Sequence, residues 1–142
     1  MSGHTFAGGL PTTPAPVIDP ETQPYWDGAE AGELVLPFCL DCEEYFWYPR
    51  GFCPRCTGSR VRWDATAGEG EIYSYSIVRR SFGQWKEHVP FVIAWVTLDE
   101  GISVSTNIID IDEDDLAIGA RVSATFERRA PEDRPILRFA PK

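Results

Sequence analysis

The chain has 142 residues and a formal net charge of −9, so it is long enough for one compact domain with a small additional module. An acidic chain gains no general attraction to phosphate backbones or anionic lipids, which disfavours nucleic acid and membrane surfaces as partners. Residues 91–98 form the longest apolar stretch, far short of a membrane span, and residues 1–10 lack the pattern of a secretory signal, so we expect a soluble, cytoplasmic protein.

Residues 1–18 are expected to form a flexible leader. This segment is rich in proline and glycine and has few apolar side chains, including at Gly8, Gly9, Pro11 and Pro14. Such a composition buries too little surface to offset the loss of chain entropy on ordering.

Residues 19–33 predict an N-terminal helix, extending from about residue 20 to residue 31. Asp19 suits the N-cap, and Pro20 suits the first helical position. One face of this helix carries the apolar side chains of Tyr25, Trp26 and Ala29. Such a stripe either packs on the chain's own domain or docks on another chain, and the sequence leaves both possibilities open.

Residues 34–63 predict a zinc ribbon, because all the cysteines of the chain lie there as two C-x-x-C pairs: Cys39, Cys42, Cys53 and Cys56. The two-residue gap lets both thiolates of a pair reach one ion, and four thiolates complete the tetrahedral shell of a structural Zn²⁺. No coordination position remains for water or substrate, so we expect the metal to organise the fold. A reducing compartment disfavours disulfides, whereas iron in the same geometry stays an alternative.

The first C-x-x-C turn departs from the usual pattern. Glu43 follows Cys42 at a position where the backbone often takes the positive φ that suits glycine. A non-glycine residue there destabilises the turn by about 1 kcal/mol without abolishing the site.

Residues 64–142 predict a β domain. Its expected strands cover residues 71–80, 90–98, 102–109, 121–129 and 136–139. The nearly continuous apolar run at 90–98 predicts a central strand covered on both faces. Five short strands suit a closed barrel because closure removes exposed edges, and the OB-fold is a common five-stranded solution.

The ordered sum of these features resembles the OB-fold, acyl-CoA-associated protein family with an N-terminal rubredoxin-like zinc ribbon (domain of unknown function 35). The resemblance extends from about residue 20 to the C-terminus. Besides the cysteines it rests on Tyr25-Trp26-Asp27, Gly32-Glu33-Leu34, Tyr48-Pro49-Arg50, Gly68-Glu69-Gly70, Tyr73-Ser74-Tyr75, Pro90-Phe91-Val92, Leu98-Asp99-Glu100-Gly101, Asp114 through Gly119, and Arg138-Phe139-Ala140-Pro141.

The resemblance implies an accessory subunit that docks on a thiolase-like enzyme of lipid, steroid or aromatic acyl-CoA degradation. In such a hetero-oligomer the small subunit helps to hold the acyl-CoA, and the partner supplies the catalytic residues. The sequence is consistent with a non-catalytic subunit, since it has no G-x-S-x-G elbow, no P-loop and no cysteine outside the ribbon. We therefore expect no catalytic residue in it.

The segment after the first barrel strand offers candidate contacts to coenzyme A. Trp85 presents an aromatic face for adenine or pantetheine, and Lys86 presents a cation for phosphate. Arg79 and Arg80 are further candidates, although neighbours on a strand point to opposite faces, so at most one of them serves a given pocket. The alternative is that Trp85 simply caps the barrel.

Two other classes of function stay open. Zinc ribbons and OB-folds also occur in nucleic-acid-binding proteins, but those combine exposed aromatic side chains with a basic groove, and this chain lacks the basic excess. A free-standing enzyme acting on acyl-CoA is the other alternative, which turnover by the isolated chain would support.

Overall fold

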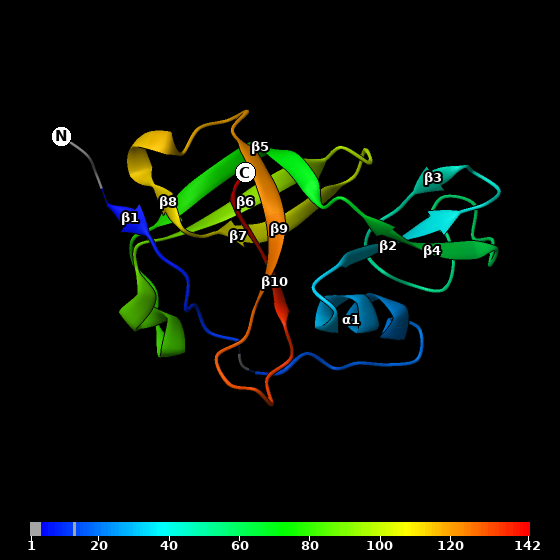
Figure 1. The fold of residues 1–142 in the computed structure, drawn as a ribbon, viewed down its shortest axis with the longest axis horizontal. Helices are drawn as coiled ribbons and strands as arrows, with labels where there is room; N and C mark the ends of the chain where they lie inside the picture. Colours follow the sequence, from blue (N-terminus) through cyan, green and yellow to red (C-terminus); the bar gives the residue numbers. More distant parts are fainter. Residues whose placement is uncertain (1–3, 13) are drawn as a thin grey trace.

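The structure, a computed structural model, describes residues 4–12 and 14–142. It joins a three-stranded sheet and a helix to a closed five-stranded barrel (Figure 1), which confirms the expected mainly β fold. In the small sheet, β2 (Leu34–Cys39) lies between β3 (Glu44–Tyr45) and β4 (Val61–Thr66). The barrel strands are neighbours in the order β10 (Ile136–Pro141), β7 (Ser103–Ile108), β6 (Phe91–Leu98), β5 (Glu69–Val78) and β9 (Arg121–Glu127).

Strand β6 alternates between a buried and an exposed face, so the expectation that it is covered on both sides is wrong. Val92, Ala94 and Val96 are at most 1% exposed and fill the barrel. Between them Ile93 and Trp95 are 44% and 49% exposed on the outside. The run is apolar throughout because its outward side chains are apolar as well as its inward ones.

A β-bulge in β5 breaks the simple alternation that the sequence predicts for this strand. Ile72 pairs with Val96, but the next pair along is Ser74 with Trp95. The extra residue between them moves Ser74 to the outer face while Ile72 stays inside, although the alternating pattern would place both on one face.

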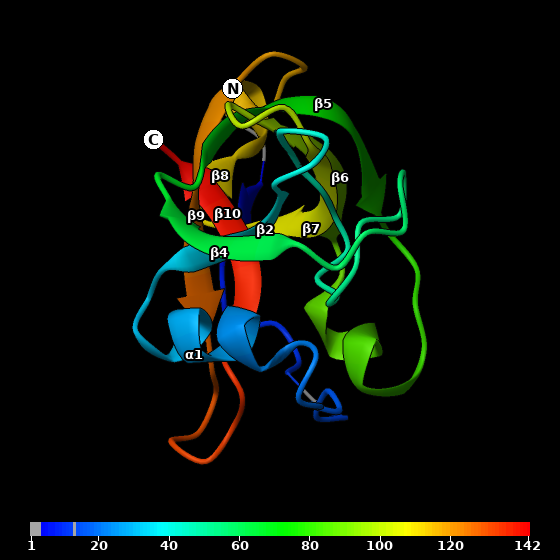
Figure 2. The ribbon, with the colours of Figure 1, turned by 90° about the vertical axis from the view of Figure 1, so that its right-hand side faces the viewer.

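The helix α1 (Gln23–Glu30) starts later than the sequence predicts, because Asp19 caps a turn and not the helix itself. Its carboxylate accepts hydrogen bonds from the backbone N–H and the hydroxyl of Thr22, which is the actual N-cap residue. Figure 2 shows α1 beside the ribbon sheet. Tyr25 and Trp26 on the apolar face of α1 are buried in the main core cluster of the chain, so this face packs within the chain.

Residues 4–12, here called the N-terminal strap, lie along the barrel. In it β1 (Thr5–Phe6) pairs with β8 (Ile111–Asp112), which precedes the 3-10 helix η2 (Glu113–Asp115). Phe6 and Leu10 are 2% and 3% exposed. The expected flexible leader is thus wrong for these residues. The buried side chains of Phe6 and Leu10 and the pairing of β1 with β8 hold the segment in place, although its average composition is poor in apolar residues. Residues 1–3 and 13 of that leader lie outside the described residues.

The ribbon and the barrel share one hydrophobic core. Leu34 and Leu36 of β2 belong to the same buried cluster as Val96 and Phe139 of the barrel. Strand β4 pairs with β2 as far as Thr66, past the expected end of the ribbon at residue 63, and leads into β5 almost at once. Gly68 makes this junction with a φ of 68°, and a Cβ there would lie 3.0 Å from the Ala124 Cβ.

Candidate metal centre and ligand groove

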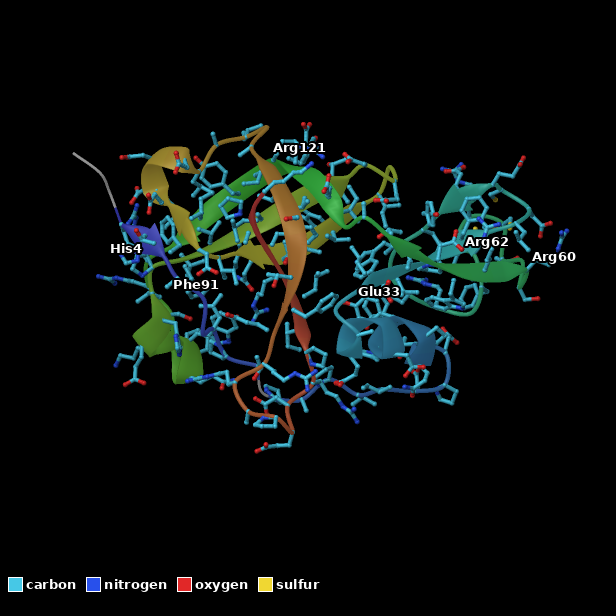
Figure 3. All side chains as sticks on the ribbon, in the orientation of Figure 1. His4, Glu33, Arg60, Arg62, Phe91 and Arg121 are labelled. Atoms are coloured by element: carbon cyan, nitrogen blue, oxygen red, sulfur yellow. The ribbon has the colours of Figure 1, made fainter. Side chains whose placement is uncertain are left out.

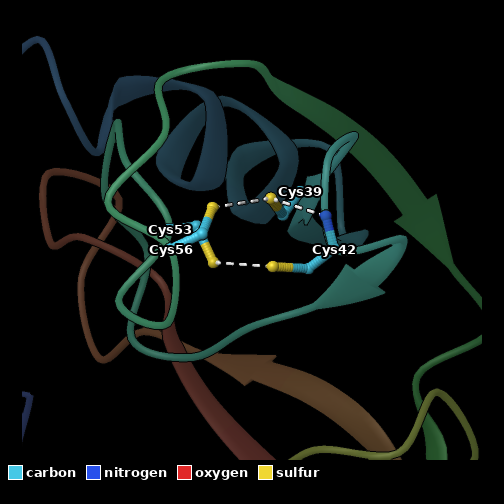
Figure 4. A group of neighbouring side chains, drawn as sticks. All are labelled: Cys39, Cys42, Cys53 and Cys56. Carbon is cyan, nitrogen blue, oxygen red and sulfur yellow. Dashed lines mark hydrogen bonds between the residues drawn. The ribbon is translucent and has the colours of Figure 1, made fainter.

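Four thiols meet at the tip of the ribbon (Figure 4), and these are the predicted ligands: Cys39, Cys42, Cys53 and Cys56. All four sulfur atoms lie within 4.8 Å of one another. The Sγ atoms of Cys39 and Cys56 are 3.7 Å apart, and those of Cys42 and Cys53 are 3.9 Å apart. A tetrahedron with Zn–S bonds of about 2.3 Å has edges of about 3.8 Å, so the thiols fit a zinc ion and are too far apart for disulfides.

The backbone supports these thiols as metal ligands. Backbone N–H groups of Cys42 and Gly58 donate to the sulfurs of Cys39 and Cys56 at 3.3 and 3.4 Å. Hydrogen bonds from the backbone N–H groups of Cys56 and Arg55 lower the pKa of the Cys53 thiol to about 7, whereas a hydrogen bond with the Cys56 sulfur raises the pKa of Cys42. A metal ion bound by all four sulfurs would displace the remaining thiol protons. A closed tetrathiolate site of this kind organises a fold and has no open position for catalysis.

Both C-x-x-C turns use a non-glycine residue in the left-handed region. Glu43 has a φ of 57° and Thr57 a φ of 60°. The sequence predicted this strain at Glu43, and the same conformation recurs at the equivalent position of the second turn. Each costs about 1 kcal/mol, which metal ligation readily offsets.

A largely apolar groove of about 610 Å³ lies where the helix and the ribbon face the barrel, and this volume is in the range of small-molecule sites. One wall comes from α1 and from the segment after β3, with Tyr25, Trp26, Trp47 and Tyr48. The other wall comes from the barrel and from the connection between β5 and β6, with Ile93 and Trp85. Burial raises the pKa of Tyr25, so its hydroxyl stays protonated. Aromatic walls of this kind fit an extended apolar or heteroaromatic ligand.

Arg138 supplies the buried charge of the groove lining and is only 5% exposed. Its Nε donates to Glu127 Oε1 at 3.1 Å, and its Nη2 donates to the Pro11 carbonyl at 2.9 Å. The other Glu127 oxygen accepts the Gly9 N–H at 2.6 Å. Burial lowers the pKa of Arg138 while Glu127 opposes this, and the group stays charged because its ordinary pKa is far above neutrality. The ion pair thus ties the strap to the groove.

Trp85 is the one predicted ligand contact that lines the groove. It lies in the 3-10 helix η1 (Gly83–His88), and its ring centroid is 4.7 Å from that of Phe91. The indole therefore covers Phe91 and also forms part of the groove wall, and its contact with a ligand stays a prediction.

The predicted cations are not part of that lining. Arg79 forms an ion pair with Glu113 at 3.6 Å, on the side of η2. Arg80 and Lys86 are exposed, and within the described residues neither forms an ion pair. The ribbon arginines Arg60 and Arg62 lie toward the outer end of the molecule, away from Phe91 (Figure 3).

Sequence reasoning missed Arg138 as a groove residue. An available signal was its position between apolar residues of a short strand, since a cation in such a strand is buried only when paired. The aromatic pair Trp47 and Tyr48 carried no such signal, because their position depends on how the ribbon meets the barrel.

A second hollow of about 560 Å³ lies between the ribbon and the turn that joins β6 to β7. Its lining includes three acidic side chains, from Glu43, Glu44 and Glu100. Arg55 also lines this hollow and pairs with Glu44, so the lining keeps a net negative charge and disfavours anionic ligands.

The fold and the metal centre together define a zinc-ribbon protein with an OB-type barrel. Residues 26–62 match the family model described as ChsH2, rubredoxin-like zinc ribbon domain. Residues 63–127 match the model described as ChsH2, C-terminal OB-fold domain.

Similar proteins extend this assignment. A DUF35 domain-containing scaffold protein of Methanothermobacter thermautotrophicus is 34% identical over 110 residues, which are 73% of this chain and 83% of that protein. A probable enoyl-CoA hydratase alpha subunit of Thermomonospora curvata is 32% identical over 130 residues, covering 89% of this chain but only 40% of that longer protein. The solved structure of an Ltp2-ChsH2(DUF35) aldolase matches with a TM-score of 0.76 at 28% identity, covering 89% of this chain and 98% of that one.

The chain therefore belongs to the DUF35 family of ChsH2-type zinc-ribbon and OB-fold proteins, and the ribbon is its structural zinc site. This confirms the family resemblance of the sequence. Across the described residues, no helix is both long and apolar enough to cross a membrane.

Proposed function

We propose that the chain is a non-catalytic subunit that docks on a thiolase-like enzyme and helps to hold its acyl-CoA substrate. The relatives named as a scaffold protein and as part of an Ltp2 aldolase support a role alongside an enzyme subunit. The partner's reaction is a thiolysis, condensation or retro-aldol cleavage of an acyl-CoA from lipid, steroid or aromatic degradation.

The observation that carries the ligand part of this proposal is the groove. Its aromatic walls suit the pantetheine arm or the acyl chain, and the guanidinium of Arg138 lies at its lining. Coenzyme A is longer than the groove, so its phosphates would lie outside it. The cations Arg79, Arg80 and Lys86 remain candidate contacts for those phosphates.

The residues around the groove support a role without catalysis. All the cysteines of the chain are in the ribbon, and neither of its histidines, His4 and His88, lines the groove. A thiolase-type reaction needs an activated nucleophile and a base, which the partner must then supply.

Reconstitution tests the proposal. The chain is co-expressed with a thiolase-like subunit of its own organism, and acyl-CoA turnover is measured for each protein alone and for the mixture. Activity that requires the mixture is the expected result. Turnover by the isolated, purified chain would instead identify it as an enzyme, and failure of the two proteins to associate would refute the docking role.

The groove is tested separately with Trp85→Ala. This variant should raise the KM of the complex for acyl-CoA while leaving assembly intact. Phe82→Ala is a matched control, because Phe82 precedes the same 3-10 helix, is 87% exposed and is not part of the groove lining. Equal kinetics for the two variants would contradict the assignment of the groove.

A further inference from the structure

The outer surface of the barrel carries an uncharged sheet face around Ile93 and Trp95. Pairing registers place their neighbours on the same side: Ser74 and Ser105 flank Trp95, and Ser76 and Asn107 flank Ile93. Thr97 and Ser103 form the next row, where their side chains share a 2.9 Å hydrogen bond. We call these eight residues the β5–β7 face; its edge is marked by Glu71, the charged residue opposite Thr97.

The composition of this face is unusual for the chain that carries it. Charged residues make up 25% of the sequence, but none of the eight is charged. Trp95 is 49% exposed, and the serines beside it on both neighbouring strands are too short to cover the indole. An exposed aromatic side chain within a patch depleted of charge is the composition of the core of a protein–protein interface.

The position of the face indicates what covers it. Ile93, Ser105 and Asn107 belong both to the face and to the lining of the groove, so the two surfaces are continuous. At the other end of β6 the same side of the strand is already covered, since Phe91 packs beneath Leu10 and Trp85. A protein that covers the groove at Ile93 and Ser105 would therefore also reach Trp95, which pairs with Ser105.

We propose that the β5–β7 face is the surface on which the thiolase-like subunit docks, with Trp95 as its central anchor. The inference rests on the proposed function and adds the place of contact and its chemistry. The partner presents an uncharged, mainly apolar pocket to the indole, because a charged group there would lose its hydration without gaining a counter-charge. Docking closes the groove between the two subunits.

The test measures the affinity of the chain for the thiolase-like subunit that reconstitutes activity with it. Trp95→Ser should raise the Kd at least about 30-fold, as expected for an aromatic hot spot. Ile118→Ser is the matched control, because Ile118 is 70% exposed on the loop after η2 and lies outside the face. Its Kd should stay within about twofold of the wild type. Thermal unfolding checks that both variants fold.

Each other outcome contradicts the proposal in a recognisable way. If the wild-type chain binds the enzyme and Trp95→Ser binds equally well, the contact lies elsewhere and only this inference fails. If the wild-type chain does not bind, the proposed function fails with it. If the isolated chain forms a dimer that Trp95→Ser abolishes, a second copy and not an enzyme occupies the face.

Discussion

Replacing Glu127 by alanine tests whether the buried ion pair fastens the N-terminal strap. Glu127 holds Arg138 at 3.1 Å and the Gly9 N–H at 2.6 Å, and the side chains of Arg138 and Glu127 are 6% and 15% exposed. In Glu127→Ala the guanidinium stays buried without this counter-charge, which destabilises a protein by about 3–5 kcal/mol. Domains of this size have a total stability of about 5–15 kcal/mol, so the loss is a large fraction of it.

The assay is urea unfolding at a fixed zinc concentration, because a bound metal adds to the apparent stability. Asp99→Ala is the control, since Asp99 pairs with Arg121 through two hydrogen bonds of 3.0 and 2.8 Å but on the exposed surface. The control should show a much smaller loss. Limited proteolysis should also cut the strap faster in Glu127→Ala than in the wild type.

A double variant sharpens this prediction. Glu127→Leu combined with Arg138→Met removes both charges and should recover much of the stability that Glu127→Ala loses, because apolar replacements of buried pairs are often neutral. Equal unfolding free energies for Glu127→Ala and Asp99→Ala would refute the reasoning, since burial would then not decide the effect.

Three further measurements test other parts of the structure. Leu10→Ala should lower the unfolding free energy by about 2–5 kcal/mol by leaving a cavity, whereas Val17→Ala, at an 89% exposed position, should be nearly neutral. Cys53→Ser should lose stoichiometric zinc in elemental analysis and, with it, both stability and partner binding; intact folding and pairing with lost activity would contradict a structural zinc. Hydrogen bonding from Arg121 lowers the pKa of Asp99, so the stability that this pair contributes is fully present above the ordinary pKa of 3.8 and is lost as the pH falls through the lower, folded-state pKa. In an NMR titration the Asp99 carboxyl should therefore ionise below pH 3.8, and Arg121→Gln should return its pKa toward that value.

Local patterns predicted the metal centre well, because all four ligands lie within two short turns whose spacing is itself the signal. The positive φ of Glu43 was predicted for the same reason. The groove could not be predicted, because Tyr25, Trp47 and Arg138 meet only when the ribbon packs on the barrel.

The strap and the outer face show two other limits of sequence reasoning. In the strap, average composition concealed the two side chains that matter, Phe6 and Leu10. In β6, the apolar run predicts burial on both faces, but Ile93 and Trp95 are exposed. A pattern rule assumes that apolar side chains are covered within their own chain, and these two exposed side chains violate that assumption.

The core that Leu34 and Leu36 share with Val96 and Phe139 has a mechanical consequence. Because β4 runs into β5 almost at once and both halves bury their side chains in one cluster, a hinge between them would have to open that cluster. The ribbon and the barrel should thus move as one body, so the two walls of the groove between them keep a constant spacing.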